Sequence, residues 1–320
     1  MAFDLSQGII AAPVTPFNSD ESVDWATLDR YMAAIAAGGP QGVAMNMAAS
    51  EGGSLTEAEQ IEVVRRTRAA AAGACAVISG VVAQSTRQAT DLAKRLVEAG
   101  ADALVVFPPL PTFVSKPLAV ETVVAYHRAI AEAAGVPIIA FQTPFVDYPA
   151  GTIRGLASIP SIVALKDAAF NVDRTVELLE EAETTPIKVL TGNDTFILEA
   201  MLMGCSGALI GFAGTATAEL VRMHALAVAG KITEAYAIWN ALGPLARICW
   251  RRPLRDYRVR MKYTLMRQGV IPCDAARAPQ PPIAAKDKDD LDRCFERYGL
   301  DDARYLPDGG RLRGSMRAAE

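Results

Sequence analysis

The sequence is poor in the residues that most often bind transition metals or form disulfides. It contains two histidines, His127 and His224, and five cysteines that are scattered without a CxxC pair. A Cys/His metal site is therefore not expected, although a Mg²⁺ site made of Asp and Glu alone stays open. Scattered cysteines in a chain of 320 residues favour a reducing compartment. We expect a cytoplasmic protein without a metal or another cofactor.

An excess of basic residues is also lacking. The chain has 32 Lys and Arg against 36 Asp and Glu, which gives a net charge of −4. Domains that bind nucleic acid carry clustered basic charge, and polybasic segments bind anionic membranes. Neither partner is expected here. The hydrophobic share of 51% is enough for a large core, which excludes a chain that is disordered throughout.

Long uncharged runs are absent with one exception. Residues 200–218 carry no charge, which approaches the length of a membrane span. Four glycines interrupt this stretch and a polar Thr-Ala-Thr run ends it, so we interpret it as a strand with flanking loops. The N-terminus has no Lys or Arg before its short apolar run, and no secretory leader is expected.

The sequence does show a regular alternation of short apolar runs and longer amphipathic ones. The short runs are mostly apolar without alternation, which is typical of strands that are covered on both faces. Eight strands are expected, at Ile9–Val14, Gly42–Met47, Ala76–Val81, Ala103–Phe107, Ile138–Gln142, Ile162–Lys166, Ile187–Thr191 and Ala208–Phe212.

Helical periodicity fills the intervals between these strands. Seven clear helices and a weaker one are predicted, the weaker at Thr152–Ala157 and the others at Val23–Ala37, Thr56–Ala72, Thr86–Ala99, Leu118–Ala134, Asn171–Glu183, Phe196–Gly204 and Ala216–Ala229. Strands and helices in this alternation predict an α/β fold, the (β/α)8 TIM barrel. A doubly wound sheet is the alternative, but no GxGxxG follows the first strand.

Beyond residue 230 the pattern is purely helical. Three helices are expected at Ile232–Ala246, Leu254–Gln268 and Lys286–Tyr298, with a Pro- and Ala-rich connector at Ala275–Pro282. We therefore predict a barrel over residues 1–230, a C-terminal three-helix extension over 231–299, and a flexible tail or intersubunit arm over 300–320.

One lysine differs from the others in its position. Enzymes with this barrel place their reactive groups at the C-terminal ends of the strands. Of the eight lysines, only Lys166 ends a predicted strand, whereas Lys188 begins one. Burial lowers the pKa of an amine, and a neutral amine attacks a ketone to form an imine. Lys166 is therefore a candidate for Schiff-base formation. The alternative is an amine that extends from the strand end into solvent.

Several segments occur in an order and spacing that are specific. They are Gly8–Phe17, Leu55–Glu59, Ala103–Pro109, Val163–Ala168, Thr191–Asp194 and Gly204–Ile210. With these segments the chain resembles the dihydrodipicolinate synthase / N-acetylneuraminate lyase superfamily of class I aldolases and dehydratases over about residues 7–300. The resemblance implies a lyase in which Lys166 forms a Schiff base with a 2-oxo acid of the pyruvate type. It also implies a homotetramer or a homodimer.

The chain departs from the superfamily pattern at the positions that move protons. The usual Gly-Thr-Thr-Gly-Glu after the second strand is Met47-Ala48-Ala49-Ser50-Glu51, and the usual tyrosine after the fifth strand is Phe141. A phenyl ring neither donates nor accepts a proton. Another tyrosine of the superfamily is replaced near Leu110, and the arginine that binds a second carboxylate is replaced near Val146. Dihydrodipicolinate synthase activity itself is therefore not expected.

The remaining residues give a set of candidates. We expect the backbone N–H groups of Ala49 and Ser50 to bind the keto-acid carboxylate. Proton transfer is assigned to one of five side chains or to water, the side chains being Glu51, Ser50, Thr143, Asp194 and Tyr148. Phe141, Thr143, Asp194 and Ile210 are expected at the substrate. The alternatives are a Glu51 carboxylate buried against loop N–H groups, an Asp194 that caps the next helix, and a Tyr148 that only packs.

Two functions remain. The first is a lyase that cleaves, condenses or dehydrates a 2-oxo acid, and the best candidate is a 2-keto-3-deoxy sugar acid. L-2-keto-3-deoxyarabonate dehydratases are similar in their Ser-Glu pair after the second strand and in lacking the fifth-strand tyrosine. The second is a barrel without turnover that binds a keto acid as a sensor or regulatory subunit. Loss of the proton relay favours the second function, whereas retention of Lys166 favours the first.

Overall fold

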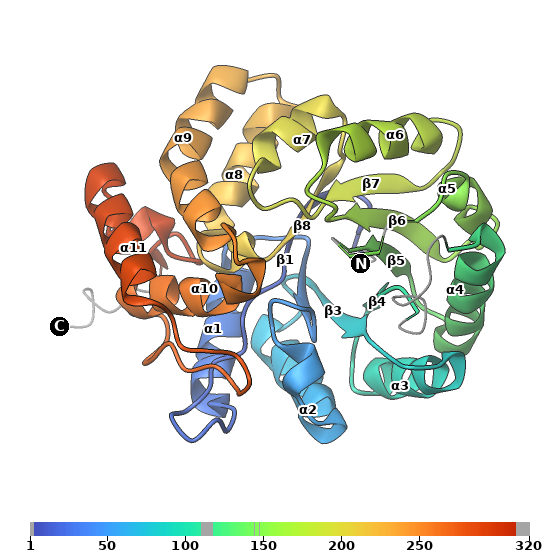
Figure 1. The fold of residues 1–320 in the computed structure, drawn as a ribbon, viewed down its shortest axis with the longest axis horizontal. Coiled ribbons are helices and arrows are strands. Elements are labelled where there is room, and N and C mark those ends of the chain that lie inside the picture. The colour runs from blue at the N-terminus through green and yellow to red at the C-terminus, as the bar shows by residue number, and fades with distance from the viewer. Residues whose placement is uncertain (1–2, 110–117, 144, 147, 312–320) are drawn as a thin grey trace.

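A closed barrel of eight parallel strands forms the centre of the molecule (Figure 1). The computed structural model describes residues 3–109, 118–143, 145–146 and 148–311. Each strand pairs with its neighbours in chain order, and β1 also pairs with β8. The strands are β1 Gly8–Ala11, β2 Gly42–Met45, β3 Ala76–Val81, β4 Ala103–Val106, β5 Ile138–Gln142, β6 Ile162–Asp167, β7 Lys188–Thr191 and β8 Gly207–Ile210. The predicted (β/α)8 barrel is confirmed.

Helices surround the barrel, one after each strand (Figure 1). They are α1 Trp25–Ala37, α2 Glu57–Ala71, α3 Thr86–Glu98, α4 Val120–Ala134, α5 Thr152–Leu156, α6 Val172–Ala182, α7 Ile197–Met203 and α8 Thr217–Val228. Local sequence fixes several of their starts. Thr56 and Glu59 form a reciprocal capping box on α2, and the side chains of Asp24, Ser85 and Asn171 cap α1, α3 and α6.

Strand residues alternate between two cores. Inward side chains such as Ile10, Ile78 and Leu209 fill the barrel, whereas outward ones such as Ile9 and Val77 pack beneath the helices. The same alternation decides where the reactive groups point. Lys166 shares the inner face with Ala164 and Ala168, and its neighbours in sequence face outward.

Several predicted strands extended too far at their C-terminal ends. β1 ends at Ala11 rather than at Val14, β2 at Met45 rather than at Met47, and β8 at Ile210 rather than at Phe212. The residues that follow are buried loop residues at the barrel mouth, and Phe212 opens the 3₁₀ turn η3 Phe212–Gly214. Because a buried loop is as apolar as a buried strand, hydrophobicity does not mark the point where strand pairing stops.

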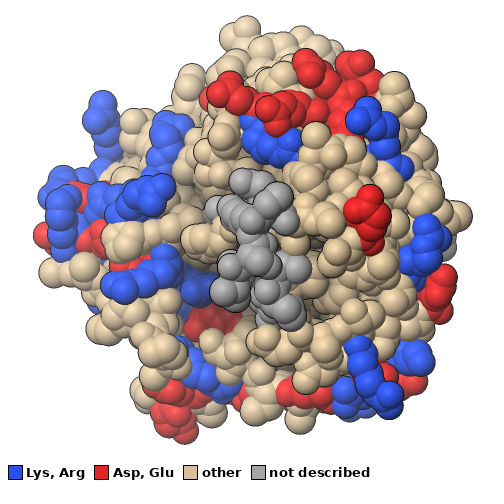
Figure 2. Space-filling view, turned by 45° about the vertical axis from the view of Figure 1, so that its right-hand side comes forward, with Lys and Arg blue, Asp and Glu red and all other residues tan. Residues whose placement is uncertain are grey.

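The C-terminal helices are α9 Ile232–Cys249, α10 Tyr257–Arg267 and α11 Ala285–Tyr298, and they lie on one side of the barrel (Figure 1). The predicted helix from Leu254 begins instead with a 3₁₀ turn, η4 Leu254–Asp256. The predicted boundary at residue 230 falls in the turn between α8 and α9. In Figure 2, basic and acidic side chains are interleaved on this side of the molecule.

Residues 300–311 pack against the same chain, whereas the sequence suggested a flexible tail or an arm for this segment. Leu300 and Tyr305 are buried, and the short turn η5 Ala303–Tyr305 accepts a hydrogen bond from the Gln268 amide at the Tyr305 carbonyl, 3.1 Å away. The N–H of Ala218 on α8 donates to the carbonyl of Pro307 at 3.1 Å. The remainder of the predicted tail lies outside the described residues.

The uncharged stretch at residues 200–218 contains the end of α7, strand β8 and η3, as its glycines predicted. Among the helices of the described residues, none combines the length and the apolar character that crossing a bilayer requires.

A buried ion pair joins α10 to α11. The Arg260 guanidinium donates to the Asp287 carboxylate at 2.7 Å, and the two side chains are 1% and 9% exposed. We expect Arg260→Met to lower the free energy of unfolding by about 2–4 kcal/mol, because Asp287 would lose its buried partner and keep only the partly exposed Arg251. Urea denaturation measures the change. The matched control, Arg304→Met, removes a partner from the exposed Asp302, and we expect a loss of at most about 1 kcal/mol. Equal losses in both variants would contradict the buried pair.

Candidate active site

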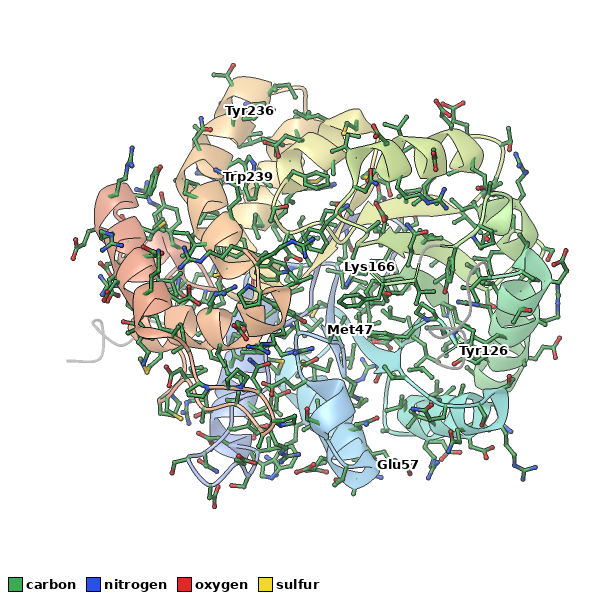
Figure 3. The ribbon with its side chains drawn as sticks, in the orientation of Figure 1. Met47, Glu57, Tyr126, Lys166, Tyr236 and Trp239 are labelled. Carbon is green, nitrogen blue, oxygen red and sulfur yellow. The ribbon has the colours of Figure 1, made fainter. Side chains whose placement is uncertain are left out.

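A cavity of about 210 Å³ opens at the C-terminal ends of the strands, and Lys166 lies in its wall. Strand ends and the loops after them supply one side, including Met47, Ala48, Ala49, Phe141, Ala168, Gly192, Asp194 and Gly211. The segment from the end of α9 to the start of α10 supplies the other side, with Trp250, Leu254, Arg255, Tyr257 and Arg258. Figure 3 shows Lys166 and Met47 at the centre of the barrel, whereas Glu57, Tyr126, Tyr236 and Trp239 lie among the outer helices.

The Lys166 amine is buried against an aromatic ring. The side chain is 7% exposed, and Nζ lies 4.2 Å from the centroid of the Phe141 ring. Phe107 packs edge-on against Phe141 at 4.8 Å and fixes its orientation. Burial lowers the pKa of Lys166 to about 8, because few polar groups replace the water that would solvate an ammonium ion. A substantial fraction of this amine is therefore neutral near pH 8.

A glycine makes room for the amine. A Cβ atom on Gly192 would lie 2.5 Å from Cε of Lys166 and 2.9 Å from Cβ of Ala168. The Gly192 N–H donates to the carbonyl of Asp167, which keeps β7 close to β6 at this level. The close approach of the two strands leaves space for the lysine side chain only if residue 192 has no side chain.

Asp167 fixes the end of β6 from outside the barrel. Its carboxylate accepts hydrogen bonds from Gln142 at 3.0 Å, Thr175 at 2.7 Å and Asn193 at 3.2 Å. The neighbouring elements β5, α6 and the loop after β7 are thereby tied to the residue next to Lys166. This network holds the backbone that carries the amine.

Asp194 is the carboxylate whose negative charge favours the ammonium form of Lys166. It accepts a hydrogen bond from the Phe212 N–H at 2.8 Å and lines the cavity. Burial raises the pKa of Asp194 to about 7, and the charge of the nearby Lys166 opposes that shift. The helix-capping alternative is wrong, because α7 begins at Ile197 and Phe196 holds the cap position without a side-chain bond.

The loop after β2 presents backbone N–H groups to the cavity. Ala48 and Ala49 line it, and within the described residues their N–H groups donate to no protein acceptor. The Ser50 hydroxyl accepts from the Met47 N–H at 2.8 Å and does not line the cavity. The Ser50 side chain therefore stabilises the loop conformation, and the loop lines the cavity at Ala48 and Ala49 instead. Successive free N–H groups of this kind bind anions.

Glu51 is directed away from the cavity. Its carboxylate pairs with Nζ of Lys262 on α10 at 2.5 Å, and both side chains are almost fully buried. The same amine donates to the Ala275 carbonyl at 2.7 Å. The burial of Lys262 on a helix far along the chain has no signal in the local sequence. The buried-carboxylate alternative for Glu51 is closer to the structure, with a lysine as the partner.

Three further candidates lie outside the cavity. The Thr143 hydroxyl accepts from the Val146 N–H at 3.2 Å, and Ile210 faces the outer core. Tyr148 packs edge-on against His127 with ring centroids 6.0 Å apart. Of the predicted site residues, Lys166, Ala49, Phe141 and Asp194 meet at the cavity, and Ser50, Glu51, Thr143 and Ile210 do not line it. The replacement near Leu110 lies outside the described residues.

Trp250 and Tyr257 form an aromatic wall opposite the strand ends. Their rings stack with centroids 5.1 Å apart, and a Cβ on Gly211 would lie 2.8 Å from the Trp250 ring. Burial raises the pKa of Tyr257 to about 12, and Arg258 opposes the shift. The structure places Trp250 at the barrel mouth. Tyr257 and Arg258 were missed, because nothing in a helical pattern tells which helix returns to the barrel.

The lowered pKa of Lys166 gives a direct prediction. Because only the neutral amine reacts, acetylation of Lys166 by acetic anhydride, followed by peptide mass spectrometry, should reach half its maximal rate near pH 8. The Asp194 carboxylate favours the ammonium form, so Asp194→Asn should move this midpoint to lower pH. A midpoint near the ordinary lysine value of about 10.4 would contradict the burial of the amine.

The glycine beside the amine gives a second prediction. Gly192→Ala forces a methyl group against Lys166 and Ala168, so we expect the free energy of unfolding to fall by about 1–3 kcal/mol. The control is Gly53→Ala, where a Cβ would meet nothing within 4 Å. Urea denaturation of the two variants measures the difference. Equal free energies of unfolding would contradict the prediction and show that β6 and β7 move apart at little cost.

Comparison with known proteins agrees with this geometry. The Dihydrodipicolinate synthetase family model matches residues 5–297. The 4-hydroxy-tetrahydrodipicolinate synthase of Chlorobium chlorochromatii is 31% identical over 297 residues, which are 92% of this chain and 97% of that protein. The enzyme of the same name from Chlorobium luteolum is 32% identical over 298 residues, which are 92% and 98% of the two chains.

Solved structures give the same result. Dihydrodipicolinate synthase from Acinetobacter baumannii, complexed with pyruvate, superposes with a TM-score of 0.82 at 28% identity over 92% of this chain and 99% of that one. A monomeric dihydrodipicolinate synthase variant shares the fold at a TM-score of 0.85 and 21% identity, over 94% and 99% of the two chains. The resemblance drawn from the sequence is confirmed, and the chain belongs to the dihydrodipicolinate synthetase family of class I, aldolase-type lyases.

Proposed function

We propose that Lys166 forms a Schiff base with a 2-oxo acid and that the protein catalyses aldol cleavage or condensation, or dehydration, of that acid. One observation carries the proposal. A buried amine with a pKa of about 8 lies at the C-terminal mouth of the barrel, in a cavity that also exposes free backbone N–H groups. The amine is the nucleophile, and the N–H groups fit the carboxylate of the substrate.

The chemistry follows from the amine. Nζ of Lys166 adds to the C2 carbonyl, the oxygen leaves as water, and a protonated imine remains. The imine accepts the electron pair that is released when a C3–H or C3–C4 bond breaks. Loss of the C3 proton allows a C4 hydroxyl to leave, which is dehydration, whereas breaking the C3–C4 bond is retro-aldol cleavage. Both routes return the amine by hydrolysis.

A group must carry the protons of these steps. Asp194 is the best candidate, because it lines the cavity and its pKa is raised to about 7, where it donates and accepts protons near neutral pH. Glu51 and Ser50 are less suitable, since the first is paired with Lys262 and the second is bonded within its own loop. Phe141 supplies an apolar surface in place of the phenol of the family.

Residues at the site also limit which substrates fit the proposal. The curated relatives are named 4-hydroxy-tetrahydrodipicolinate synthases, but Phe141 and Val146 replace the tyrosine and the arginine associated with that activity. A 2-keto-3-deoxy sugar acid stays our preferred substrate, with its hydroxyl groups near Asp194 and its chain against Trp250 and Tyr257. We also expect the homotetramer or homodimer that the family implies.

Reduction of the imine tests the proposal. Incubation with pyruvate and borohydride should add one reduced pyruvyl group, seen by intact mass and located at Lys166 by peptide mapping. Lys166→Met should abolish the adduct, because no other lysine lines the cavity in the described residues. Lys188→Met, at the exposed start of β7, should leave it unchanged.

Consumption of a panel of 2-keto-3-deoxy sugar acids then separates turnover from binding. An adduct at Lys166 without consumption of any panel member would favour a barrel that binds a keto acid as a sensor. The absence of an adduct with pyruvate and with every other 2-oxo acid tried would refute Schiff-base chemistry.

A further inference from the structure

Two cations on α10 contact the loop after β2, and one of them, Arg258, also lines the cavity. Nε of Arg258 donates to the Ala48 carbonyl at 2.6 Å, and Nζ of Lys262 pairs with the Glu51 carboxylate at 2.5 Å. The two residues are four apart in the helix and therefore lie on the same face. Together they contact the loop near its beginning and at its end.

The first contact helps to set the orientation of a peptide group, together with a longer hydrogen bond from the Glu51 N–H to the same Ala48 carbonyl at 3.3 Å. In a planar trans peptide the C=O of one residue and the N–H of the next point in opposite directions. A carbonyl of Ala48 that is directed at Arg258 therefore turns the N–H of Ala49 away from Arg258. That N–H donates to no acceptor within the described residues, and Ala49 lines the cavity of Lys166.

The neighbouring peptide groups are held in the same way. The Met47 carbonyl accepts from the Gly52 N–H at 3.0 Å, so the Ala48 N–H points elsewhere. The Ser50 carbonyl accepts from the Thr15 hydroxyl at 2.7 Å. The carbonyl oxygens of Met47, Ala48 and Ser50 are thus engaged by the protein, while the N–H groups of Ala48 and Ala49 are left without a partner in the described chain.

Arg258 itself has no carboxylate partner among the described residues. Its other contacts are a long one from Nη1 to the Gln280 amide oxygen at 3.5 Å, and one with Tyr257, whose ring centroid lies 5.1 Å from Cζ. Arg255, by contrast, pairs with Asp256, and Arg260 pairs with Asp287. The positive charge of Arg258 is therefore not cancelled, and it lies at the loop that exposes the free N–H groups.

We infer that Arg258 is a positioning residue, which orients the Ala48–Ala49 peptide so that its N–H binds the carboxylate of the substrate, with Lys262 holding the other end of the loop. A helix of the C-terminal extension thereby prepares the backbone of the loop for the carboxylate. The inference rests on the proposed function, because that function supplies the carboxylate.

Calorimetric binding of oxamate tests the inference without imine chemistry. Oxamate has the carboxylate and shape of pyruvate, but its amide carbonyl does not condense with an amine. We expect Arg258→Leu to weaken oxamate binding by about tenfold or more, equivalent to about 1.4 kcal/mol for a lost backbone hydrogen bond. Arg258→Lys retains a donor for the Ala48 carbonyl and should restore most of the affinity, and it serves as the second variant if Arg258→Leu does not fold.

The control removes an arginine from the same helix. Arg267 pairs with Asp292 and Asp301 and makes no contact with the loop after β2, so Arg267→Leu should leave oxamate binding unchanged. Borohydride trapping adds a readout that general damage would not produce. Arg258→Leu should raise the half-saturating concentration of pyruvate but not that of hydroxyacetone, a ketone without a carboxylate.

Each outcome of these experiments either supports or overturns the role of Arg258. Unchanged oxamate binding in Arg258→Leu, equal weakening in Arg267→Leu, or equal loss with both ketones overturns the inference. Wild-type protein that traps pyruvate but does not bind oxamate also overturns it, while the Schiff-base function stands. Wild-type protein that binds oxamate in an Arg258-dependent way but traps no 2-oxo acid supports the inference and removes the proposed function.

Discussion

The site depends on one desolvated amine. Lys166 lies on the inner face of β6 with the Phe141 ring 4.2 Å from Nζ, and Asp194 is the carboxylate whose charge favours its ammonium form. Withholding solvent lowers the pKa of Lys166 and raises that of Asp194, so the two groups approach each other in proton affinity. A base and an acid with similar pKa values near neutrality are what imine formation and proton transfer need. Gly192, Asp167 and the Phe107–Phe141 pair maintain this arrangement.

The C-terminal helices complete the site. The barrel alone supplies the amine, the acid and the strand-end loops, but Trp250 and Tyr257 form the opposite wall, and Arg258 and Lys262 hold the loop after β2. Buried ion pairs such as Arg260–Asp287 fix α10 in turn. The extension and the barrel thus share the walls of one cavity, which connects the stability of the C-terminal helices to the geometry around Lys166.

The missing hydroxyls of the loop after β2 illustrate how such a site diverges. With alanine at two positions, the loop has no side-chain oxygen to offer the cavity, and the Ser50 hydroxyl is used within the loop. The backbone still has N–H groups, and their direction is set by what binds the carbonyl groups on the other side. A family pattern lost in side chains is thus compatible with an anion site made from main chain.

The sequence by itself determined the barrel, because eight buried strands alternating with helices leave few other folds, and it identified Lys166, because only that lysine ends a strand. Through the resemblance of their motifs it also predicted Asp194 and Phe141 as site residues, and both line the cavity of Lys166. Strand ends were overrun, because buried loops are as apolar as strands.

Only the tertiary structure decided which way each mouth residue faces. Glu51, Ser50, Thr143 and Ile210 stand at the right level of the barrel, but alternation and local turns direct them elsewhere. The ion-pair partner of Glu51 lies about two hundred residues away in the sequence. No local sequence pattern predicts that Lys262 and Arg258 contact the loop after β2. The periodicity of a sequence indicates which residues of an element are buried. Which residues of distant elements they contact is set by the packing of the tertiary structure.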